Sequence, residues 1–195
     1  MSLKFQREYQ LTNYLNKFLF YTLNLARYLK YLGRELWSAS AIILITVLLM
    51  ISTYLHWLPL NFTLGPYRFI HWLSWIGSSF IAIFTPIFYM LRRRYPQRNT
   101  AIVRTHIFSN LFSFMLISIH FAQQFSRAVH PEDRTGLTLY IIVAILVTTG
   151  FLHRFQMLEK GRIYPPHRNR YLHISVTTAF YLVIVIHILH NLGIL

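Results

Sequence analysis

Five stretches of predominantly apolar residues divide this 195-residue chain. A helix that crosses a bilayer needs about 20 such residues, and each stretch has about that length. Hydrophobic residues make up 55% of the sequence and charged residues 12%, which is too apolar for an ordinary water-soluble fold. The sequence therefore predicts an all-α membrane protein with five transmembrane helices. The expected spans are about Leu36–Trp57, Phe69–Leu91, Thr105–Ser126, Thr135–Phe155 and Tyr171–Ile194.

The spans leave little of the chain for anything else. We expect residues 36–195 to form one transmembrane domain and residues 1–35 to form an N-terminal amphipathic helix in the cytoplasmic interface. Between Tyr9 and Tyr31 apolar residues recur near helical spacing among basic ones, which is typical of an interfacial helix; packing on a partner subunit is the alternative. The first residues lack the features of a signal peptide, so we expect a mature start at Met1. Any nucleotide-binding or flavin-binding module is expected on another chain.

The basic residues are distributed unevenly between the two ends of the spans. In a soluble protein a net charge of +14 would suggest nucleic acid. Here sixteen of the 19 lysines and arginines fall in the N-terminal stretch and in the second and fourth connections. By the positive-inside rule, the N-terminus is expected inside and the C-terminus outside. The expected location is a prokaryotic cell membrane or the mitochondrial inner membrane, and nucleic acid is not an expected partner.

The third and fifth expected spans each carry two histidines that are fourteen positions apart. These are His106 with His120, and His173 with His187. On an α-helix this separation is almost four turns, so both histidines of a span face the same way, about 21 Å apart. Both spans run from inside to outside, so His106 shares a depth with His173, and His120 shares one with His187. Imidazoles within hydrocarbon are costly and usually functional.

Two stacked imidazole pairs are what two haems need for axial ligation. The sequence therefore predicts a four-helix dihaem core that binds two haem b groups through these four histidines. His190, one turn after His187, is an alternative outer ligand. His71 and His153 lie just inside span ends, where a redox role is the less favoured interpretation. Isolated histidines at span ends are typical interfacial residues: His56, His130 and His167.

Further residues are expected to support the haems. The second nitrogen of each ligating imidazole needs a hydrogen-bond partner. The candidates are neighbouring carbonyls and the hydroxyls of Ser109, Ser113, Ser118, Thr177 and Thr178. Haem propionates need cations, and phospholipid contact is the alternative role for the same arginines. The inner candidates are Arg104, Arg168 and Arg170, and the outer candidates are Arg127 and Arg68.

The absence of cysteine from the sequence, and of Asp and Glu from the expected spans, limits which functions are compatible with this chain. The sequence contains no cysteine, which excludes disulfides, thiolate metal sites and iron–sulfur ligation by this chain. The five expected spans contain no Asp or Glu, whereas proton or cation transport usually needs a buried carboxylate. A non-haem transporter or scaffold is therefore the less favoured alternative.

The histidine pattern resembles the ferric reductase-like transmembrane family, which includes NADPH oxidases, ferric reductases and the haem subunit of the methionine sulfoxide reductase system. The resemblance covers roughly Phe69 to Leu195 and implies that His106/His120 and His173/His187 ligate haem. The chain departs from the family in having neither a sixth span nor a fused flavin and nicotinamide domain. The same spacing occurs in the cytochrome b of quinol-oxidising complexes. A cytochrome b561 arrangement, with one histidine from each of four successive helices, fits less well because His71 and His153 lie at opposite depths.

We therefore expect an electron-transfer subunit of an oxidoreductase complex without a catalytic domain of its own. Bis-histidine ligation leaves no open position on iron, so the haems would carry single electrons across the membrane. The expected donor is a partner redox protein or quinone, with an acceptor on the other side. The expected partners are membrane lipid, other redox subunits and quinone. A haem-bearing structural anchor of a respiratory complex is the alternative.

Overall fold

The computed structural model describes three stretches of the chain and one further residue, namely residues 33–125, 134–155 and 166–191 together with Ile194. The chain divides into two compact units, Met1–Ser38 and Ala39–Leu195. Of the first unit only residues 33–38 are described, and they belong to a helix that is described from Gly33 to Tyr54. The amphipathic helix expected within residues 1–35 therefore lies almost entirely outside the described residues.

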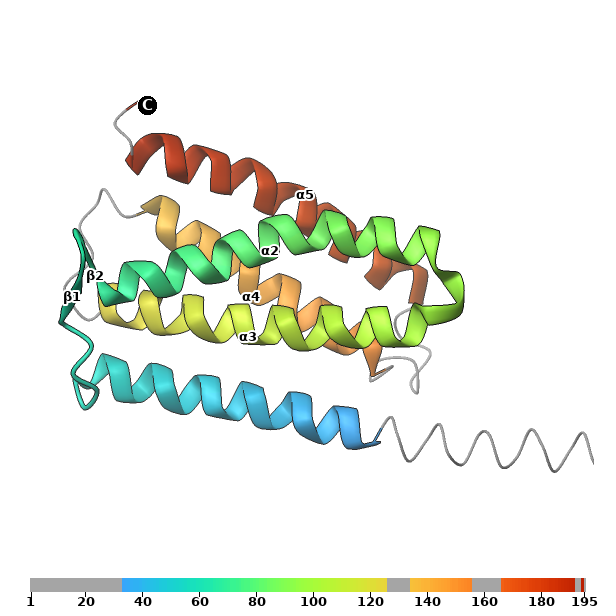
Figure 1. Ribbon diagram of the computed structural model, residues 1–195, viewed down its shortest axis with the longest axis horizontal. Coiled ribbons are helices and arrows are strands. Elements are labelled where there is room, and N and C mark those ends of the chain that lie inside the picture. Colours follow the sequence, from blue (N-terminus) through green and yellow to red (C-terminus); the bar gives the residue numbers. More distant parts are fainter. Residues whose placement is uncertain (1–32, 126–133, 156–165, 192–193, 195) are drawn as a thin grey trace, which may run out of the picture. The chain divides into compact units, whose positions relative to one another are not determined.

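Five helices in the described residues are long and apolar enough to cross a membrane, which confirms the predicted all-α membrane fold (Figure 1). They are the first helix (Gly33–Tyr54), α2 (Phe69–Arg94), α3 (Asn99–Phe125), α4 (Arg134–Arg154) and α5 (Pro166–Asn191). A 3-10 turn, η1 (Pro96–Arg98), leads directly into α3, so this helix begins earlier than the sequence predicted. Two short antiparallel strands, β1 (Thr63–Leu64) and β2 (Tyr67–Arg68), join the first helix to α2.

The first helix includes an acidic residue that the expected span did not. Glu35 is 2% exposed and lies one position before the predicted start at Leu36. The expected span, which begins at Leu36, contains no Asp or Glu, but the described helix also includes Gly33 to Glu35. The boundary differs because hydropathy marks where the apolar core begins, whereas a helix continues for as long as its backbone hydrogen bonds do.

The first helix ends at a histidine in the left-handed conformation. His56 has φ 59°, and the N–H of the next residue, Trp57, donates to the Ser52 carbonyl at 2.9 Å. The His56 N–H donates to the Thr53 carbonyl at 3.1 Å. These two bonds form a Schellman motif, whose left-handed position is usually glycine. His56 is thus an exposed helix-end residue, in agreement with its predicted place at the end of a span.

Aromatic side chains fasten the β1–β2 turn to the start of α2. The rings of Phe62 and Phe69 stack with centroids 4.6 Å apart, and the Trp72 indole N–H donates to the Leu64 carbonyl at 2.9 Å. The amide of Gln123 in α3 donates to the Asn61 side chain at 3.0 Å. The beginning of α2, and with it Ile70 and His71, is therefore held against the end of α3.

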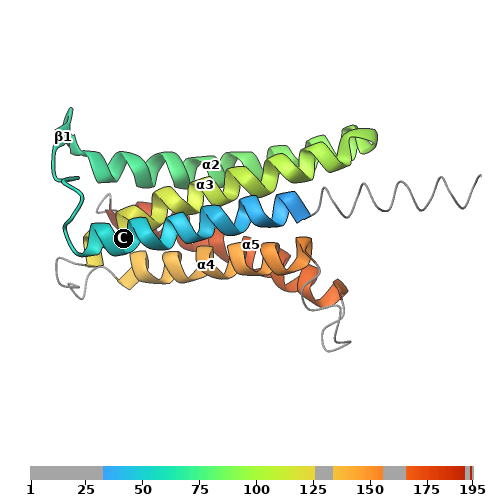
Figure 2. The same ribbon diagram turned by 90° about the horizontal axis from the view of Figure 1, so that it is seen from below.

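Within residues 39–195, α2 and α3 form an antiparallel pair, α4 packs along α5, and α3 also contacts α4 (Figures 1 and 2). Gly77 lets α2 pack tightly against α3. A Cβ atom on Gly77 would lie 2.9 Å from the Ser113 carbonyl oxygen and 2.9 Å from Ile117 Cγ1. Only a residue without a side chain allows this approach.

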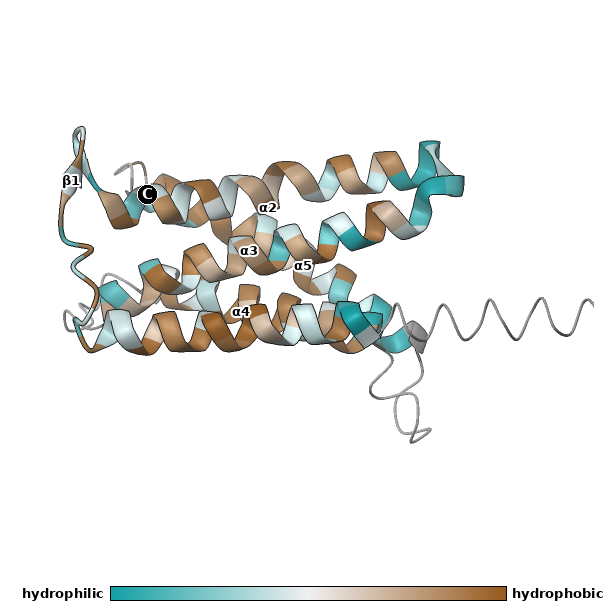
Figure 3. Ribbon diagram, turned by 60° about the horizontal axis from the view of Figure 1, so that its bottom comes forward, coloured by the Kyte–Doolittle hydropathy of each residue, from teal (hydrophilic) through white to brown (hydrophobic). Residues whose placement is uncertain are grey.

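A cluster of buried side chains from α2, α3, α4 and α5 forms the core. Its members are Ile81, Ile117, Leu139, Val143, Leu146, Phe180 and Ile184. Many other large apolar side chains are exposed, among them Leu44 at 60%, Ile83 at 61% and Leu182 at 65%. Hydrophobic residues line the lengths of the helices, and hydrophilic ones gather where α2 turns into α3 (Figure 3). An apolar exterior of this extent is typical of a surface that contacts lipid.

A tyrosine of α5 compensates for the proline inside α2. Pro86 has no N–H, so the carbonyl four residues earlier, that of Ala82, loses its partner within the helix. The Tyr181 hydroxyl donates to this carbonyl at 2.9 Å. In lipid no water can take that role, so the hydrogen bond both satisfies the α2 backbone and joins α2 to α5.

Candidate haem-ligating histidines

The four predicted ligands lie on α3 and α5 and are all partly buried. Successive helices run in opposite directions, so α3 and α5 run the same way. His106 and His173 therefore share one end of the bundle, called the inner level here. His120 and His187 share the other end, called the outer level. Phe180, which is fully buried, lies halfway between the two histidines of α5, and its cluster separates the two levels.

At the inner level the two predicted ligands interact with each other and with neighbouring rings. The imidazoles of His106 and His173 are close enough to interact electrostatically. The His106 ring stacks on Phe88 of α2, with centroids 4.0 Å apart and an interplanar angle of 18°. His153, an exposed residue at the end of α4, also interacts electrostatically with His173. The inner level thus combines a partly buried pair from α3 and α5 with a third, more exposed imidazole.

The amide of Asn110 lies beside His106, one turn further along α3. Its nitrogen is 3.0 Å from Nδ1 and 3.2 Å from Nε2 of the ring, while its oxygen is buried without a hydrogen-bond partner. A half-turn of the amide exchanges these two atoms with little change in shape. The oxygen would then accept a proton from Nδ1, leaving the Nε2 lone pair for a metal.

His173 is held by α4. The Thr149 hydroxyl oxygen lies 2.9 Å from Nδ1 of the ring, and the same hydroxyl donates to the Ile145 carbonyl at 2.8 Å. A hydroxyl has one proton to donate. Its oxygen therefore accepts the Nδ1–H of His173, and the lone pair of this imidazole lies on Nε2.

His120 at the outer level has the same tautomer for a different reason. Its Nδ1 lies 3.1 Å from the backbone carbonyl oxygen of Ile70 in α2. A carbonyl only accepts, so Nδ1 carries the proton and Nε2 is left with its lone pair. His71, the next residue, lies beside His120 with ring centroids 5.4 Å apart. The sequence predicted backbone carbonyls among the hydrogen-bond partners of the ligating imidazoles, and the Ile70 carbonyl is such a partner for His120.

Two glycines of α4 face the two histidines of α5. A Cβ on Gly150 would lie 3.2 Å from His173 Cε1, and one on Gly136 would lie 3.7 Å from His187 Cε1. The glycines are fourteen positions apart, as the histidines are, because antiparallel helices keep a constant register. Each imidazole of α5 therefore lies against a gap in the side chains of α4. This contact also distinguishes His187 from His190, which is exposed.

The arrangement fits axial ligation of haem. Within the described ranges no group of three or more His, Cys, Asp or Glu side chains could hold a metal ion, but haem ligation needs only two imidazoles for each iron. His120 and His173 each direct the protonated nitrogen to a protein acceptor, which is the usual arrangement of a metal-ligating histidine. The rings of His173 and His187 pack against Gly150 and Gly136, where α4 has no side chain.

Among the other predicted supporting residues, Thr177 donates from its hydroxyl to the backbone carbonyl of His173 at 2.7 Å. Arg104, Arg168 and Arg170 are exposed and near the inner level in sequence, Arg68 is exposed on β2, and Arg127 lies outside the described residues. The hydroxyls of Ser109, Thr177 and Thr178 bond to carbonyls in their own helices. Ser118 lies 3.3 Å from the Tyr140 hydroxyl. Ser113 is buried.

Sequence reasoning missed Thr149, Asn110 and the two glycines. Asn110 follows His106 by four positions, so helical spacing could have indicated it. Thr149 precedes His173 by 24 positions, on another helix, and no local pattern joins them. Gly136 and Gly150 repeat the separation of the histidines, which is a signal that the sequence does contain.

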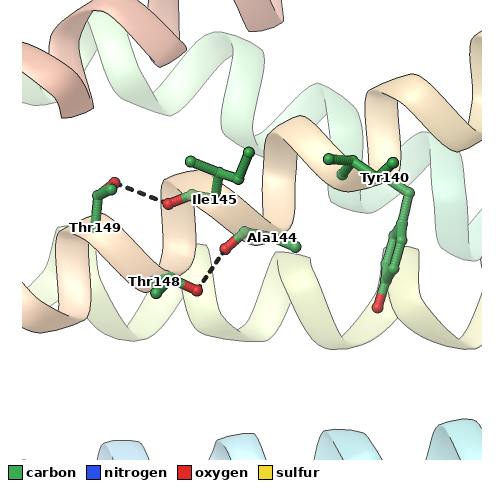
Figure 4. A pocket seen from close by; sticks show the side chains of 6 residues that line it. Tyr140, Ala144, Ile145, Thr148 and Thr149 are labelled. Atoms are coloured by element: carbon green, nitrogen blue, oxygen red, sulfur yellow. Dashed lines mark hydrogen bonds between the residues drawn. The ribbon is translucent and has the colours of Figure 1, made fainter.

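A shallow hollow of about 270 Å³ follows one face of α4 beside this site. It is lined by Tyr140, Ile141, Ala144, Ile145, Thr148 and Thr149 (Figure 4). The Thr148 hydroxyl donates to the Ala144 carbonyl at 2.8 Å, just as the Thr149 hydroxyl donates to the Ile145 carbonyl (Figure 4). The hollow is mostly apolar and borders the inner level through Thr149.

No family model, curated protein or solved structure matches the chain.

Proposed function

We propose that this protein is a dihaem b-type cytochrome subunit that carries electrons across a membrane between a partner redox protein or quinone and an acceptor on the opposite side. One observation carries the proposal most directly. Partly buried imidazoles on two parallel membrane-crossing helices lie at two levels, and His120 and His173 donate from Nδ1 to protein acceptors. This hydrogen bonding leaves Nε2 available to iron at each level.

The residues have distinct roles in this function. His106 and His173 would hold the inner haem, and His120 and His187 the outer one. A haem held by two such imidazoles would supply one-electron transfer. The buried cluster around Phe180 excludes water between the levels. The exposed arginines near the inner level offer positive charge to propionates or to lipid phosphates.

The orientation and partners belong to the same proposal. The cationic ends of α2, α4 and α5 would face the cytoplasm or matrix by the positive-inside rule, with the C-terminus outside. The protein would reside in a prokaryotic cell membrane or the mitochondrial inner membrane, with other redox subunits or quinone as partners. The resemblance to ferric reductase-like proteins depends on the histidine pairs and is part of this proposal.

A cytochrome b561-type ligand set is the second candidate, because the structure brings His71 close to His120. In that arrangement α2 and α4 would each supply one ligand. However, α4 presents Gly136 at the outer level, and its His153 lies at the inner one. A ligand pair from α2 and α4 at a single level is therefore not available from His71 and His153.

The test is the haem content of purified protein and of four alanine variants. We expect two b-type haems per chain, with a sharp reduced α-band in the visible spectrum. His106→Ala and His173→Ala should remove the same spectroscopic component, and His120→Ala and His187→Ala the other. The exposed histidines provide matched controls: His56→Ala and His190→Ala should keep both haems.

Three outcomes would change the conclusion. Protein without haem would favour a transporter or scaffold. Full haem retention in any two of the four ligand variants would reject the ligand set, and loss of a haem in His71→Ala or His153→Ala would favour the b561 arrangement. Haems that are not reduced by quinol or by a co-purified partner would favour a structural anchor.

A further inference from the structure

Thr149 is attached to α5 through both its backbone and its side chain. The Asn169 amide donates to the Thr149 carbonyl at 3.1 Å, and Nδ1 of His173 lies 2.9 Å from the Thr149 hydroxyl oxygen. Asn169 and His173 are one helical turn apart. Thr149 is only 6% exposed, so neither contact competes with solvent.

The direction of the contact with His173 follows from the other bonds of the hydroxyl. Its proton points to the Ile145 carbonyl at 2.8 Å, with the Leu146 carbonyl also near at 3.1 Å. The oxygen is therefore left to accept the Nδ1–H of the imidazole. The Leu146 carbonyl also lies within hydrogen-bonding range of this ring, and it too can only accept. Both neighbours on α4 thus favour one tautomer.

We propose that Thr149 is the positioning residue of the inner level: it fixes the Nδ1–H tautomer and orientation of His173 and thereby sets the reduction potential of the haem that His173 ligates. The tautomer part depends on geometry alone, whereas the potential part rests on the proposed function. A hydrogen bond from Nδ1–H makes the opposite nitrogen a more basic ligand. A more basic ligand stabilises ferric over ferrous iron and so lowers the potential.

Thr148 supplies a matched control next to Thr149. Both hydroxyls donate to the carbonyl four residues earlier, at 2.8 Å in each case, as Figure 4 shows. Thr148 is exposed, whereas Thr149 is buried against His173. Replacing either threonine with valine preserves the side-chain shape and removes one hydroxyl. An effect confined to Thr149→Val therefore reports the contact with the imidazole rather than a change in α4.

The first measurement is a redox titration of both haems in Thr149→Val, Thr149→Ser and Thr148→Val. We expect Thr149→Val to raise the potential of one component only. The Leu146 carbonyl remains as an acceptor, so we expect about a tenfold change in the ratio of oxidised to reduced iron. Tenfold is the lower end of the range by which loss of such a partner changes metal affinity. Tenfold corresponds to about 59 mV for a one-electron couple. Thr149→Ser and Thr148→Val should match the wild type.

The second measurement uses haem-free protein with nitrogen-labelled histidine. The ring-nitrogen shifts of His173, assigned by their loss in His173→Ala, should show the Nδ1–H tautomer in the wild type and in Thr149→Ser. In Thr149→Val they should show a larger fraction of the Nε2–H tautomer than in the wild type. Thr149→Ala serves in the same comparison if the valine variant does not fold.

The two measurements separate failure of this inference from failure of the proposed function. Wild-type protein that contains no haem refutes the dihaem proposal, while the tautomer measurement still decides the role of Thr149. An unchanged tautomer in Thr149→Val overturns the inference. So do unchanged potentials, an equal shift of both components, or a Thr149→Ser variant that behaves like Thr149→Val.

Discussion

Replacing Tyr181 with phenylalanine tests how the bundle accommodates a proline in a membrane-crossing helix. The change removes the hydroxyl that donates to the Ala82 carbonyl at 2.9 Å. Because Pro86 has no N–H, that carbonyl is then left without the usual helical donor. An unsatisfied buried acceptor costs about 1–3 kcal/mol, and hydrogen bonds between membrane helices reach at most about 1.7 kcal/mol. We therefore expect Tyr181→Phe to lower the free energy of unfolding by about 1–1.7 kcal/mol.

The same substitution should do less harm when the proline is absent. In Pro86→Ala the new N–H can donate to the Ala82 carbonyl within α2, so the hydroxyl of Tyr181 becomes redundant. We expect Tyr181→Phe to cost about 0.5 kcal/mol in this background. The double-mutant cycle should therefore give a coupling energy of about 1 kcal/mol, which exceeds the deviation from additivity usual at independent sites.

The assay is unfolding of the purified protein in mixed micelles, followed by helical circular dichroism, for the wild type, both single variants and the double variant. Thr148→Val provides the control, because the Thr148 hydroxyl bonds to the Ala144 carbonyl of its own helix, α4, and does not involve the Ala82 carbonyl. It should be additive with Pro86→Ala. Equal destabilisation by Tyr181→Phe in both backgrounds would refute the reasoning.

Three further predictions follow from particular contacts. Gly150→Ala should reduce the haem content of the inner level, because the new Cβ would lie 3.2 Å from His173 Cε1. Gly136→Ala should have a smaller effect, because its Cβ would make an ordinary contact of 3.7 Å with His187 Cε1. Equal loss of haem in the two variants, measured by reduced spectra, would contradict this. His56→Gly should raise unfolding stability by about 1 kcal/mol, since φ 59° suits glycine; no gain in the micelle assay would argue against strain there. A tag after Leu195 should be cleaved by protease added to intact cells, and protection would reverse the proposed orientation.

The sequence by itself determined the five helices and the depths of the histidines. Both results depend only on distances along the chain. The thickness of a bilayer fixes how many apolar residues a span needs, and the helical rise and turn fix where His106 and His120 lie along one face. Hydropathy placed the ends of the helices less well, because it follows the apolar core rather than the backbone. The first helix therefore includes Glu35, which lay just outside the predicted span.

Only the tertiary structure decided what lies opposite each of these residues. Periodicity specifies the face of a helix but not the neighbour that covers it. The partners of His173 and His120 are the Thr149 hydroxyl and the Ile70 carbonyl, and they come from other helices. The same holds for Tyr181, which completes the backbone of α2 from a position 99 residues after Ala82. These contacts depend on how the helices rotate and approach one another, and the packing of the whole bundle sets both.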